Sequence, residues 1–215
     1  MKSGTGYDRL ARAYRWLERL AFGDSLMRAR LAHLEVLEGA TRVLIVGEGD
    51  GRFLRALCRR RVKRVVCVEQ SGEMIALARR RLMRSECRSE VEFRQEDIRV
   101  VDLEEAAFDV LVTLFVLDVF DEGELAALVP RLAAALRPGG VWLLADFAVP
   151  AGGLARRRAQ LWLWLLYRFF GLMTVMSARE LVPPDPLLAR AGLVAGVERV
   201  FEGGLLRSLV FRKAP

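Results

Sequence analysis

Residues 42–57, RVLIVGEGDGRFLRAL, join an apolar run to a helix-forming run through Gly47, Gly49 and Gly51. The apolar residues up to Val46 predict a buried strand, and a helix is expected to begin directly after the last glycine. A strand, a glycine turn and a helix N-terminus together present outward-pointing amide N–H groups and the positive end of a helix dipole. We therefore expect a ligand-binding loop at these glycines.

The rest of the chain alternates short apolar runs with amphipathic runs, which is typical of βαβ units. The early strand-like runs are almost continuously apolar, as in a parallel sheet that helices cover on both faces. Gly203-Gly204 separates two further strand-like runs and indicates a hairpin. We expect an α/β fold with a Rossmann-like, doubly wound sheet of seven strands, mostly parallel, with an antiparallel C-terminal hairpin. The expected strands are 42–46, 64–68, 90–94, 109–114, 141–145, 193–201 and 205–212, and the expected helices are 7–37, 51–61, 72–84 and 122–136, the last stopped by RPGG at 137–140.

No linker-like segment divides the 215 residues, so we expect a single domain over 1–215. A helical cap is expected at about 1–38, and an apolar helical insert or lid at about 152–180. Within the insert, residues 154–177 begin with three arginines and continue as a long apolar run. Because this run lies between two strands of one sheet, we do not expect it to span a membrane. A buried helix, a mobile lid, a dimer interface and peripheral contact with a membrane surface all fit the pattern.

Composition limits the function classes further. The formal net charge of +7 is compatible with nucleic acid or anionic lipid as a partner, or with a surface that simply carries arginine. Most arginine clusters fall at the expected C-terminal ends of helices, away from the glycine loop, so no nucleic-acid partner is expected. Cys58, Cys67 and Cys87 show no metal-ligand spacing, which favours reduced thiols in a cytoplasmic protein without a metal site. The location we expect is the cytoplasm, with peripheral contact at the inner membrane face as the alternative.

Further elements follow the glycine loop at informative spacings. Arg52 stands where the dinucleotide fingerprint G-x-G-x-x-G would need glycine. Glu69 lies at the end of the second expected strand, where a carboxylate can accept hydrogen bonds from ribose hydroxyls. The run EQSGEMIALARRR opens the next helix, and RQEDI places Asp97-Ile98 after the third strand. Together these elements resemble the class I S-adenosylmethionine-dependent methyltransferases over most of residues 42–147.

The resemblance implies S-adenosylmethionine as cofactor and a role for each matching position. The loop glycines would let the backbone approach the methionine and ribose portions, and Glu69 would bind the ribose hydroxyls. Adenine would lie between Gln70, Met74, Asp97 and Ile98, and the end of the fourth strand would lie beneath the sulfonium. Two tyrosines of the leading segment would close over the cofactor, or else pack in the core. The positions expected to contact the cofactor are Tyr7, Tyr14, Gly47, Glu48, Gly49, Asp50, Gly51, Glu69, Gln70, Met74, Asp97, Ile98, Thr113 and Phe115.

One position departs from the family pattern. Members often carry an acid two residues before the first glycine, and Ile45 stands there in this chain. Glu48 and Asp50 lie inside the loop and can supply the missing negative charge toward the ammonium of the cofactor. This hypothesis predicts weaker cofactor binding when either carboxylate is neutralised.

Methyl transfer from a sulfonium is an in-line displacement that needs alignment and the exclusion of water. Asp118, in the apolar run TLFVLDVF, is the candidate for proton transfer; the alternative is that it caps the helix starting near Asp121. The order of ADFAVP at 145–150 and the apolar insert resembles the small-molecule methyltransferases of ubiquinone and menaquinone biosynthesis. The resemblance implies a small lipophilic or aromatic acceptor. A membrane-held lipid or quinone acceptor and a catalytically silent cofactor-binding protein are alternatives, and the sequence leaves the oligomeric state open.

Overall fold

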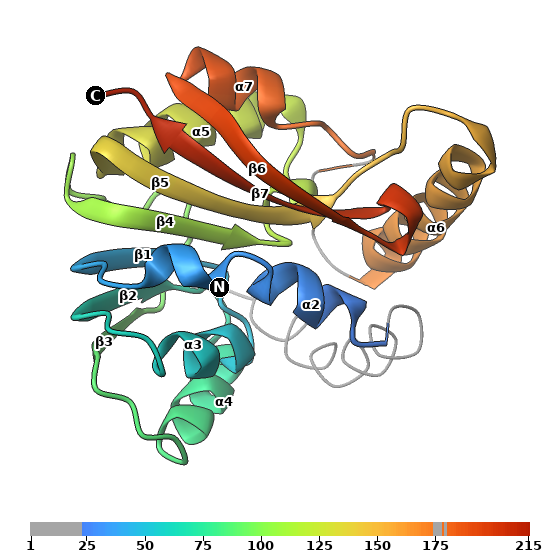
Figure 1. Cartoon of the computed structure of the whole chain (residues 1–215). Helices are drawn as coiled ribbons and strands as arrows, with labels where there is room; N and C mark the ends of the chain where they lie inside the picture. Colours follow the sequence, from blue (N-terminus) through green and yellow to red (C-terminus); the bar gives the residue numbers. More distant parts are fainter. Residues whose placement is uncertain (1–22, 174–177, 179) are drawn as a thin grey trace.

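The computed structural model describes residues 23–173, 178 and 180–215, and its centre is one seven-stranded sheet (Figure 1). The strand order is β3-β2-β1-β4-β5-β7-β6, with β7 antiparallel to both of its neighbours. The predicted fold, a mostly parallel doubly wound sheet with an antiparallel C-terminal hairpin, is confirmed. The strands are β1 (Arg42–Val46), β2 (Arg64–Val68), β3 (Glu90–Arg94), β4 (Phe108–Leu114), β5 (Leu136–Phe147), β6 (Leu193–Phe201) and β7 (Leu206–Lys213).

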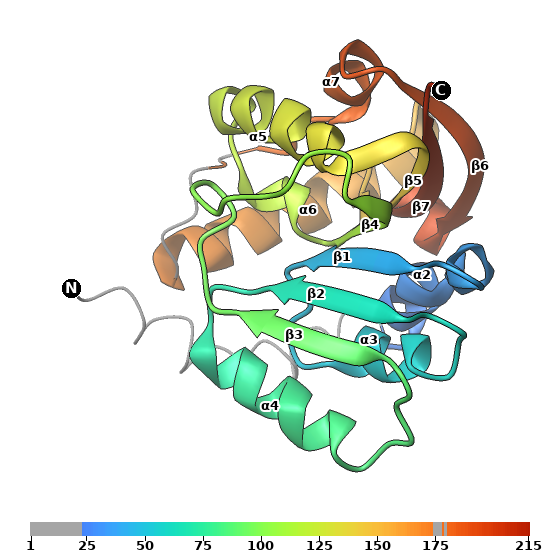
Figure 2. The same ribbon diagram turned by 90° about the vertical axis from the view of Figure 1, so that its left-hand side faces the viewer.

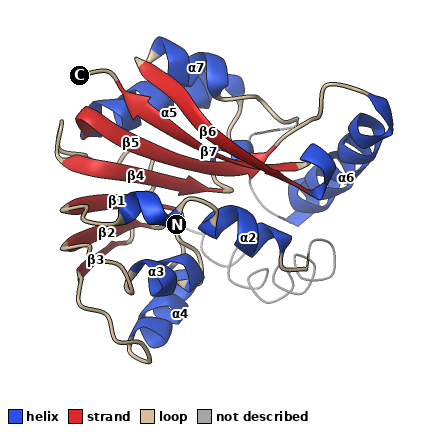
Figure 3. Cartoon of the chain, in the orientation of Figure 1, coloured by secondary structure: helices blue, strands red, loops and turns tan. Residues whose placement is uncertain are grey.

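Helices cover both faces of the sheet (Figures 1, 2 and 3), which explains why the central strands are apolar along their whole length. Alternate residues of β1 point to opposite faces: Leu44 belongs to the apolar cluster that includes residues of α5 and α7, whereas Ile45 belongs to the one that includes residues of η1 and α3. Both side chains are fully buried. The helical elements are α2 (Ser25–Leu31), η1 (Leu34–Leu37), α3 (Arg52–Leu57), α4 (Gly72–Leu82), η2 (Leu117–Val119), α5 (Glu122–Ala135), α6 (Gly153–Met173), α7 (Asp185–Arg190) and η3 (Glu202–Gly204).

The strand order reverses between β1 and β4, which pair in parallel. Ligands of open α/β sheets bind outside the carboxyl ends of the strands at such a reversal. Helices α2 and α6 lie at this end, toward which the β4 arrow points in Figure 1. They meet the end of β5 and the Leu205-Leu206 pair that follows η3 in a third apolar cluster, which includes Leu26, Phe147 and Leu163. The fold therefore gathers the glycine loop and both helices at one end of the sheet.

The element boundaries differ from expectation in two places. Helix α5 ends at Ala135, as RPGG predicts, but the expected turn before the strand is wrong, because β5 begins at Leu136 and runs through these residues. A register shift between Phe108 and Val110 in the partner strand accommodates the irregular turn. The described part of the expected helix 7–37 is broken into α2 and η1, and its first sixteen residues, 7–22, lie outside the described residues.

The expectation of three reduced cysteines is also wrong. Cys58 and Cys87, 29 residues apart, form a disulfide that ties the end of α3 to the segment before β3. Cys67 is a free, buried thiol in β2. The spacing concealed this pair because the two cysteines meet only when α3 and the β3 edge fold onto the same face.

Candidate active site

The glycine loop is shaped by close contacts with two neighbouring segments. All three of its glycines have positive φ, between 67° and 84°. A Cβ on Gly47 would overlap Cγ2 of Val116, and a Cβ on Gly51 would lie 2.6 Å from the Cα of Ala78 in α4. A Cβ on Gly49 would meet nothing within 4 Å. The outer two glycines thus allow protein packing, while the middle one faces open space.

Glu69 holds the loop from the end of β2. Its two carboxylate oxygens accept hydrogen bonds from Gly49 N (3.1 Å) and Ser71 N (2.9 Å). Burial raises the pKa of Glu69, and the N–H groups of Ser71, Gly49 and Gln70 oppose this shift. The carboxylate is therefore fixed beside the open face of the loop, where the sequence predicts the ribose.

The two acids inside the loop have different environments. Asp50 is buried, and its carboxylate contacts Arg52 (3.1 Å) and Arg81 (3.0 Å). Burial opposes its ionisation, but the two arginines outweigh burial and lower its pKa. Asp50 thus connects the loop to α4, and its charge is already neutralised.

Glu48 has an unused oxygen. Its Oε1 accepts from Leu54 N (2.9 Å) in the first turn of α3, where the N-cap Gly51 has no side chain to do so. Its Oε2 is buried and has no hydrogen-bond donor among the described residues. Burial raises the pKa of Glu48 to about 8, against the opposing effects of Leu54 N–H and Arg30. A cationic ligand group at Oε2 would favour its ionised form, so this position suits the cofactor ammonium.

The positions expected around adenine are only partly available. Ile98 is buried in the core, and Gln70 is exposed. The Asp97 carboxylate is held by Arg99, whose Nη2 lies 2.6 Å away, and this contact lowers the pKa of Asp97. Met74, in the first turn of α4, is partly buried, and its N–H donates to the Ser71 side chain. An adenine amino group would compete with Arg99 for Asp97.

The end of β4 contains one inward and one strained residue. Thr113 is fully buried and its Oγ1 accepts from the Trp142 indole (2.8 Å), so its side chain belongs to the core. Phe115 has φ of +60°, which is uncommon for a side chain of this size. Its ring packs edge-on against Phe147 (5.3 Å) and lies under the Arg30 guanidinium (5.2 Å). Strained backbone of this kind is typical of functional sites.

Asp118 does not cap α5. Asp121 is the N-cap and forms a reciprocal capping box with Glu124. Asp118 lies in η2, and its carboxyl group contacts that of Asp146 at the end of β5. Burial raises the pKa of Asp118 to about 6 and also raises the pKa of Asp146.

Neither Arg30 nor Asp146 was predicted as a site residue, yet the structure brings both to this end of the sheet, together with Tyr167 of the predicted apolar insert. Asp146 follows the apolar run of β5, and an acid ending a buried strand was the available signal. Arg30 of α2 acts electrostatically on both Glu48 and Asp118. Tyr167 of α6 donates to the backbone oxygen of Asp118 (3.0 Å). The predicted Tyr7 and Tyr14 lie outside the described residues.

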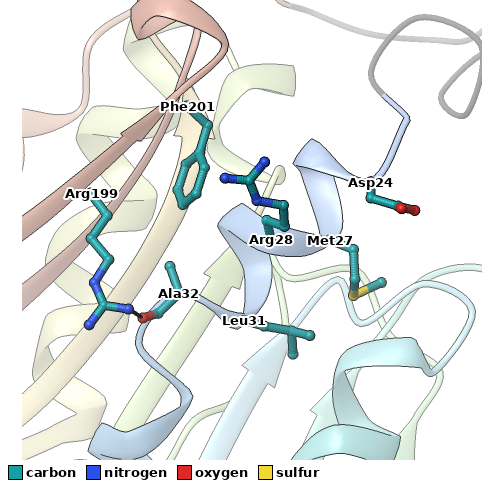
Figure 4. Close-up of a pocket in the computed structure, with 7 residues that line it drawn as sticks. All are labelled: Asp24, Met27, Arg28, Leu31, Ala32, Arg199 and Phe201. Carbon is teal, nitrogen blue, oxygen red and sulfur yellow. Dashed lines mark hydrogen bonds between the residues drawn. The ribbon is translucent and has the colours of Figure 1, made fainter.

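A separate surface hollow of about 420 Å³ lies between α2 and β6 (Figure 4). Its walls come from both elements, with Arg28, Met27 and Leu31 on one side and Arg199 and Phe201 on the other. The hollow thus lies on different elements from the glycine loop and from the carboxyl pair. We do not assign it to the cofactor.

Comparison with known proteins agrees with this geometry. Residues 43–140 match the family model described as a methyltransferase domain. Phosphatidylethanolamine N-methyltransferase from Cereibacter sphaeroides is 35% identical over 154 residues, which cover 69% of this chain and 73% of that protein.

Solved structures share the fold at low sequence identity. The N-methyltransferase NodS from Bradyrhizobium japonicum WM9 is 17% identical with a TM-score of 0.62, covering 88% of this chain and 97% of that chain. NodS has also been solved with S-adenosyl-L-homocysteine, the cofactor product. An O-methyltransferase family protein from Burkholderia thailandensis is 21% identical with a TM-score of 0.69, covering 91% of this chain and 59% of that chain. The chain belongs to the class I S-adenosylmethionine-dependent methyltransferases and is an enzyme that uses S-adenosylmethionine.

Proposed function

We propose that the methyl acceptor is the amine nitrogen of a phospholipid headgroup, which the enzyme reaches at a membrane surface. The Cereibacter relative is named for transfer to the nitrogen of phosphatidylethanolamine, which supports a lipid amine as acceptor. Of the acceptors that the sequence leaves open, we thus favour a membrane-held lipid over a freely diffusing aromatic molecule.

The outward face of α6 is the observation that carries the proposal. Leu161 and Trp164 are 59% and 58% exposed, and Leu154, Trp162 and Leu165 are exposed beside them. The opposite face of the helix packs into the protein through Ala159 and Leu163. Among the described residues, no helix combines the length and hydrophobicity needed to cross a bilayer. A partly exposed apolar helix of this kind is typical of contact in the plane of a membrane.

The charges of α6 favour an anionic partner. The helix has no acidic residue, and Arg156, Arg157 and Arg158 are exposed in its first turns. Arg168 lies over the Trp164 ring (5.7 Å). Arginine and tryptophan together suit the headgroup region, where anionic lipids attract cations and the indole is half-solvated.

The location of α6 connects membrane contact to catalysis. Tyr167 lies on this helix and donates to the backbone of Asp118. A lipid headgroup held by α6 would therefore lie close to the carboxyl end of the sheet, where the glycine loop lies. Long diffusion of the acceptor from the bilayer would not be needed.

Vesicles test the proposal with a matched pair of variants. Trp164→Ser/Leu165→Ser removes apolar area worth about 3 kcal/mol, so vesicle binding should fall on the order of a hundredfold. Val194→Ser/Val197→Ser removes apolar side chains of β6 that are more exposed than Trp164 and Leu165, and should leave binding unchanged. Co-sedimentation with vesicles of phosphatidylethanolamine and phosphatidylglycerol measures both.

Methyl transfer from labelled S-adenosylmethionine gives the second readout. The α6 variant should lose activity on vesicles but keep it on monomeric short-chain phosphatidylethanolamine, which does not need a surface. Failure of the unaltered enzyme to label either form would refute the lipid acceptor. Equal vesicle binding by both variant pairs would refute the role of α6.

A further inference from the structure

We propose that Asp118 and Asp146 share a single proton, which lies on Asp146, and that the ionised Asp118 binds the protonated amine of the acceptor and takes its proton. Asp118 is then a catalytic residue and Asp146 a positioning residue. The assignment of an amine as the acceptor rests on the proposed function, whereas the shared proton does not depend on it.

The contact between the two carboxyl groups requires a proton. Asp118 Oδ1 and Asp146 Oδ2 are both buried, and neither has a hydrogen-bond donor among the described residues outside the pair. The two groups are nevertheless in hydrogen-bond contact with each other. Two carboxylates can make this contact only when one of them is protonated, since like charges at this distance do not both ionise.

Burial identifies the member that holds the proton. Asp146 is 1% exposed, and its Oδ1 accepts from Phe147 N (2.8 Å). Asp118 is only partly buried and follows the end of β4. The charged form is favoured at the better solvated residue, so Asp118 carries the charge and is the carboxylate that an acceptor can reach.

The surrounding charges leave the pair with one negative charge. Arg207 lies opposite Asp146 in the β5–β7 register, but its guanidinium is bound by Asp185, with Nη1 2.9 Å from Oδ1. Arg30 of α2 acts on Asp118 from the other side. Two more titratable groups lie nearby: Tyr167 interacts with both acids of the pair, and Glu180 interacts with Tyr167. Arg207 is thus shared between two acids and does not fully neutralise Asp146.

The pair lies beside the glycine loop. Val116, two residues before Asp118, contacts Gly47 so closely that a Cβ there would overlap it. Arg30 acts on Glu48 in the loop as well as on Asp118. The cofactor methyl group and the acceptor amine would therefore meet between the loop and the pair.

The chemistry balances without another reactant. An ammonium donates one proton to the Asp118 carboxylate, which leaves a neutral amine with a free electron pair. These two electrons form the new N–C bond. The C–S bond breaks at the same time and its electrons return to sulfur, so the positive charge moves from sulfur to nitrogen. Asp118 releases its proton to water after the product has left.

Infrared spectroscopy tests the shared proton without any acceptor. At neutral pH, the difference between the enzyme and Asp146→Asn should show one lost protonated-carboxyl band, because the asparagine variant leaves only ionised Asp118. The difference isolates the pair from Glu48, which is unchanged in both samples. Asp102→Asn, at an exposed position, should lose no such band. A difference spectrum without the lost band would overturn the proposal whatever the acceptor is.

The pH profile of kcat/KM on short-chain phosphatidylethanolamine tests the catalytic role. Asp146→Asn still donates a hydrogen bond to Asp118, so its acid limb should coincide with that of the unaltered enzyme. Asp146→Ala removes the donor and should move the limb about one pH unit toward neutral. Asp118→Asn should lose activity at least tenfold while keeping its affinity for S-adenosylhomocysteine in calorimetry.

Two results would refute this role and leave the acceptor assignment intact. One is an acid limb at the same pH in Asp146→Ala and in the unaltered enzyme. The other is full activity of Asp118→Asn on phosphatidylethanolamine. If the unaltered enzyme methylates no lipid, the assignment of a lipid acceptor is refuted instead. The infrared measurement then still tests the shared proton by itself. Thermal denaturation of each variant, with Asp146→Asn as the conservative reference, identifies any loss caused by unfolding.

Discussion

Replacement of Gly47 by alanine should destabilise the enzyme more than the same replacement at Gly49. Both positions have φ near +68°, where alanine costs about 1–2 kcal/mol. Only at Gly47 does the added Cβ also overlap Val116, and overpacking of this kind costs about 1–3 kcal/mol more. We expect a loss of about 2–5 kcal/mol for Gly47→Ala and about 1–2 kcal/mol for Gly49→Ala.

Val116→Ala provides the test of mechanism. In a double-mutant cycle with Gly47→Ala, removal of the overlapping methyl group should recover about 1–3 kcal/mol of the loss. The same cycle with Gly49→Ala should show no coupling, because a Cβ there meets nothing within 4 Å. Urea denaturation gives the free energies of unfolding. Each kcal/mol corresponds to about 2–4 °C in Tm for a chain of this size.

Cofactor affinity should follow the opposite order. Gly49 faces open space beside Glu69, so its alanine variant should weaken S-adenosylhomocysteine binding although the fold is little changed. Calorimetric titration measures this. Equal destabilisation at the two glycines, or zero coupling between Gly47 and Val116, would refute the packing argument.

Two further predictions concern the loop acids and the disulfide. Burial raises the folded-state pKa of Glu48 from 4.5 to about 8, so its stabilising contribution is fully present below about pH 4.5 and is lost as the pH rises through 8. Glu48→Gln should flatten this decline in urea titrations and weaken S-adenosylhomocysteine binding, whereas Asp50→Asn should mainly lower Tm by breaking its two arginine contacts. Equal cofactor affinities in both variants and the unaltered enzyme would contradict the assignment of Glu48. Cys58→Ser opens the 29-residue link to Cys87 and should cost about 3–4 kcal/mol of stability under oxidising conditions, with no difference once both proteins are reduced.

The fold was predictable because its signals are local and agree with one another. Val43 to Val46 form an uninterrupted apolar run that ends at a glycine, and both faces of this strand are covered. RPGG marks the end of α5 correctly, but local preference does not show that Leu136 and Val141, on either side of it, both pair with β4 and leave the four residues as an irregularity inside β5. The disulfide failed for a related reason, since cysteine spacing says nothing about which segments meet in space.

The candidate site was predictable only where its residues follow a strand directly. Glu69 could be placed from its distance to the first glycine, and the structure puts its carboxylate beside the loop. Arg30 comes from α2, which has no fixed spacing to the loop, so no local pattern identifies it; Tyr167 could be placed in the apolar insert but not beside Asp118. Asp97 also directly follows a strand, so its position after β3 could be predicted. Its ion pair with Arg99 could not be predicted from the sequence.

The distribution of buried acids argues for where the chemistry occurs. Within the described chain, three buried carboxylate oxygens have no donor apart from the proton that Asp118 and Asp146 share, and they belong to Glu48, Asp118 and Asp146. Each such group costs stability, so a protein core ordinarily avoids them. All three occur at the carboxyl end of the sheet, and Arg30 acts on two of them. A fold that needed only to be stable would replace them with apolar residues, as it does at Ile45. Their concentration at the strand reversal supports the proposal that they are kept for two cations, the cofactor ammonium at Glu48 and the acceptor amine at Asp118.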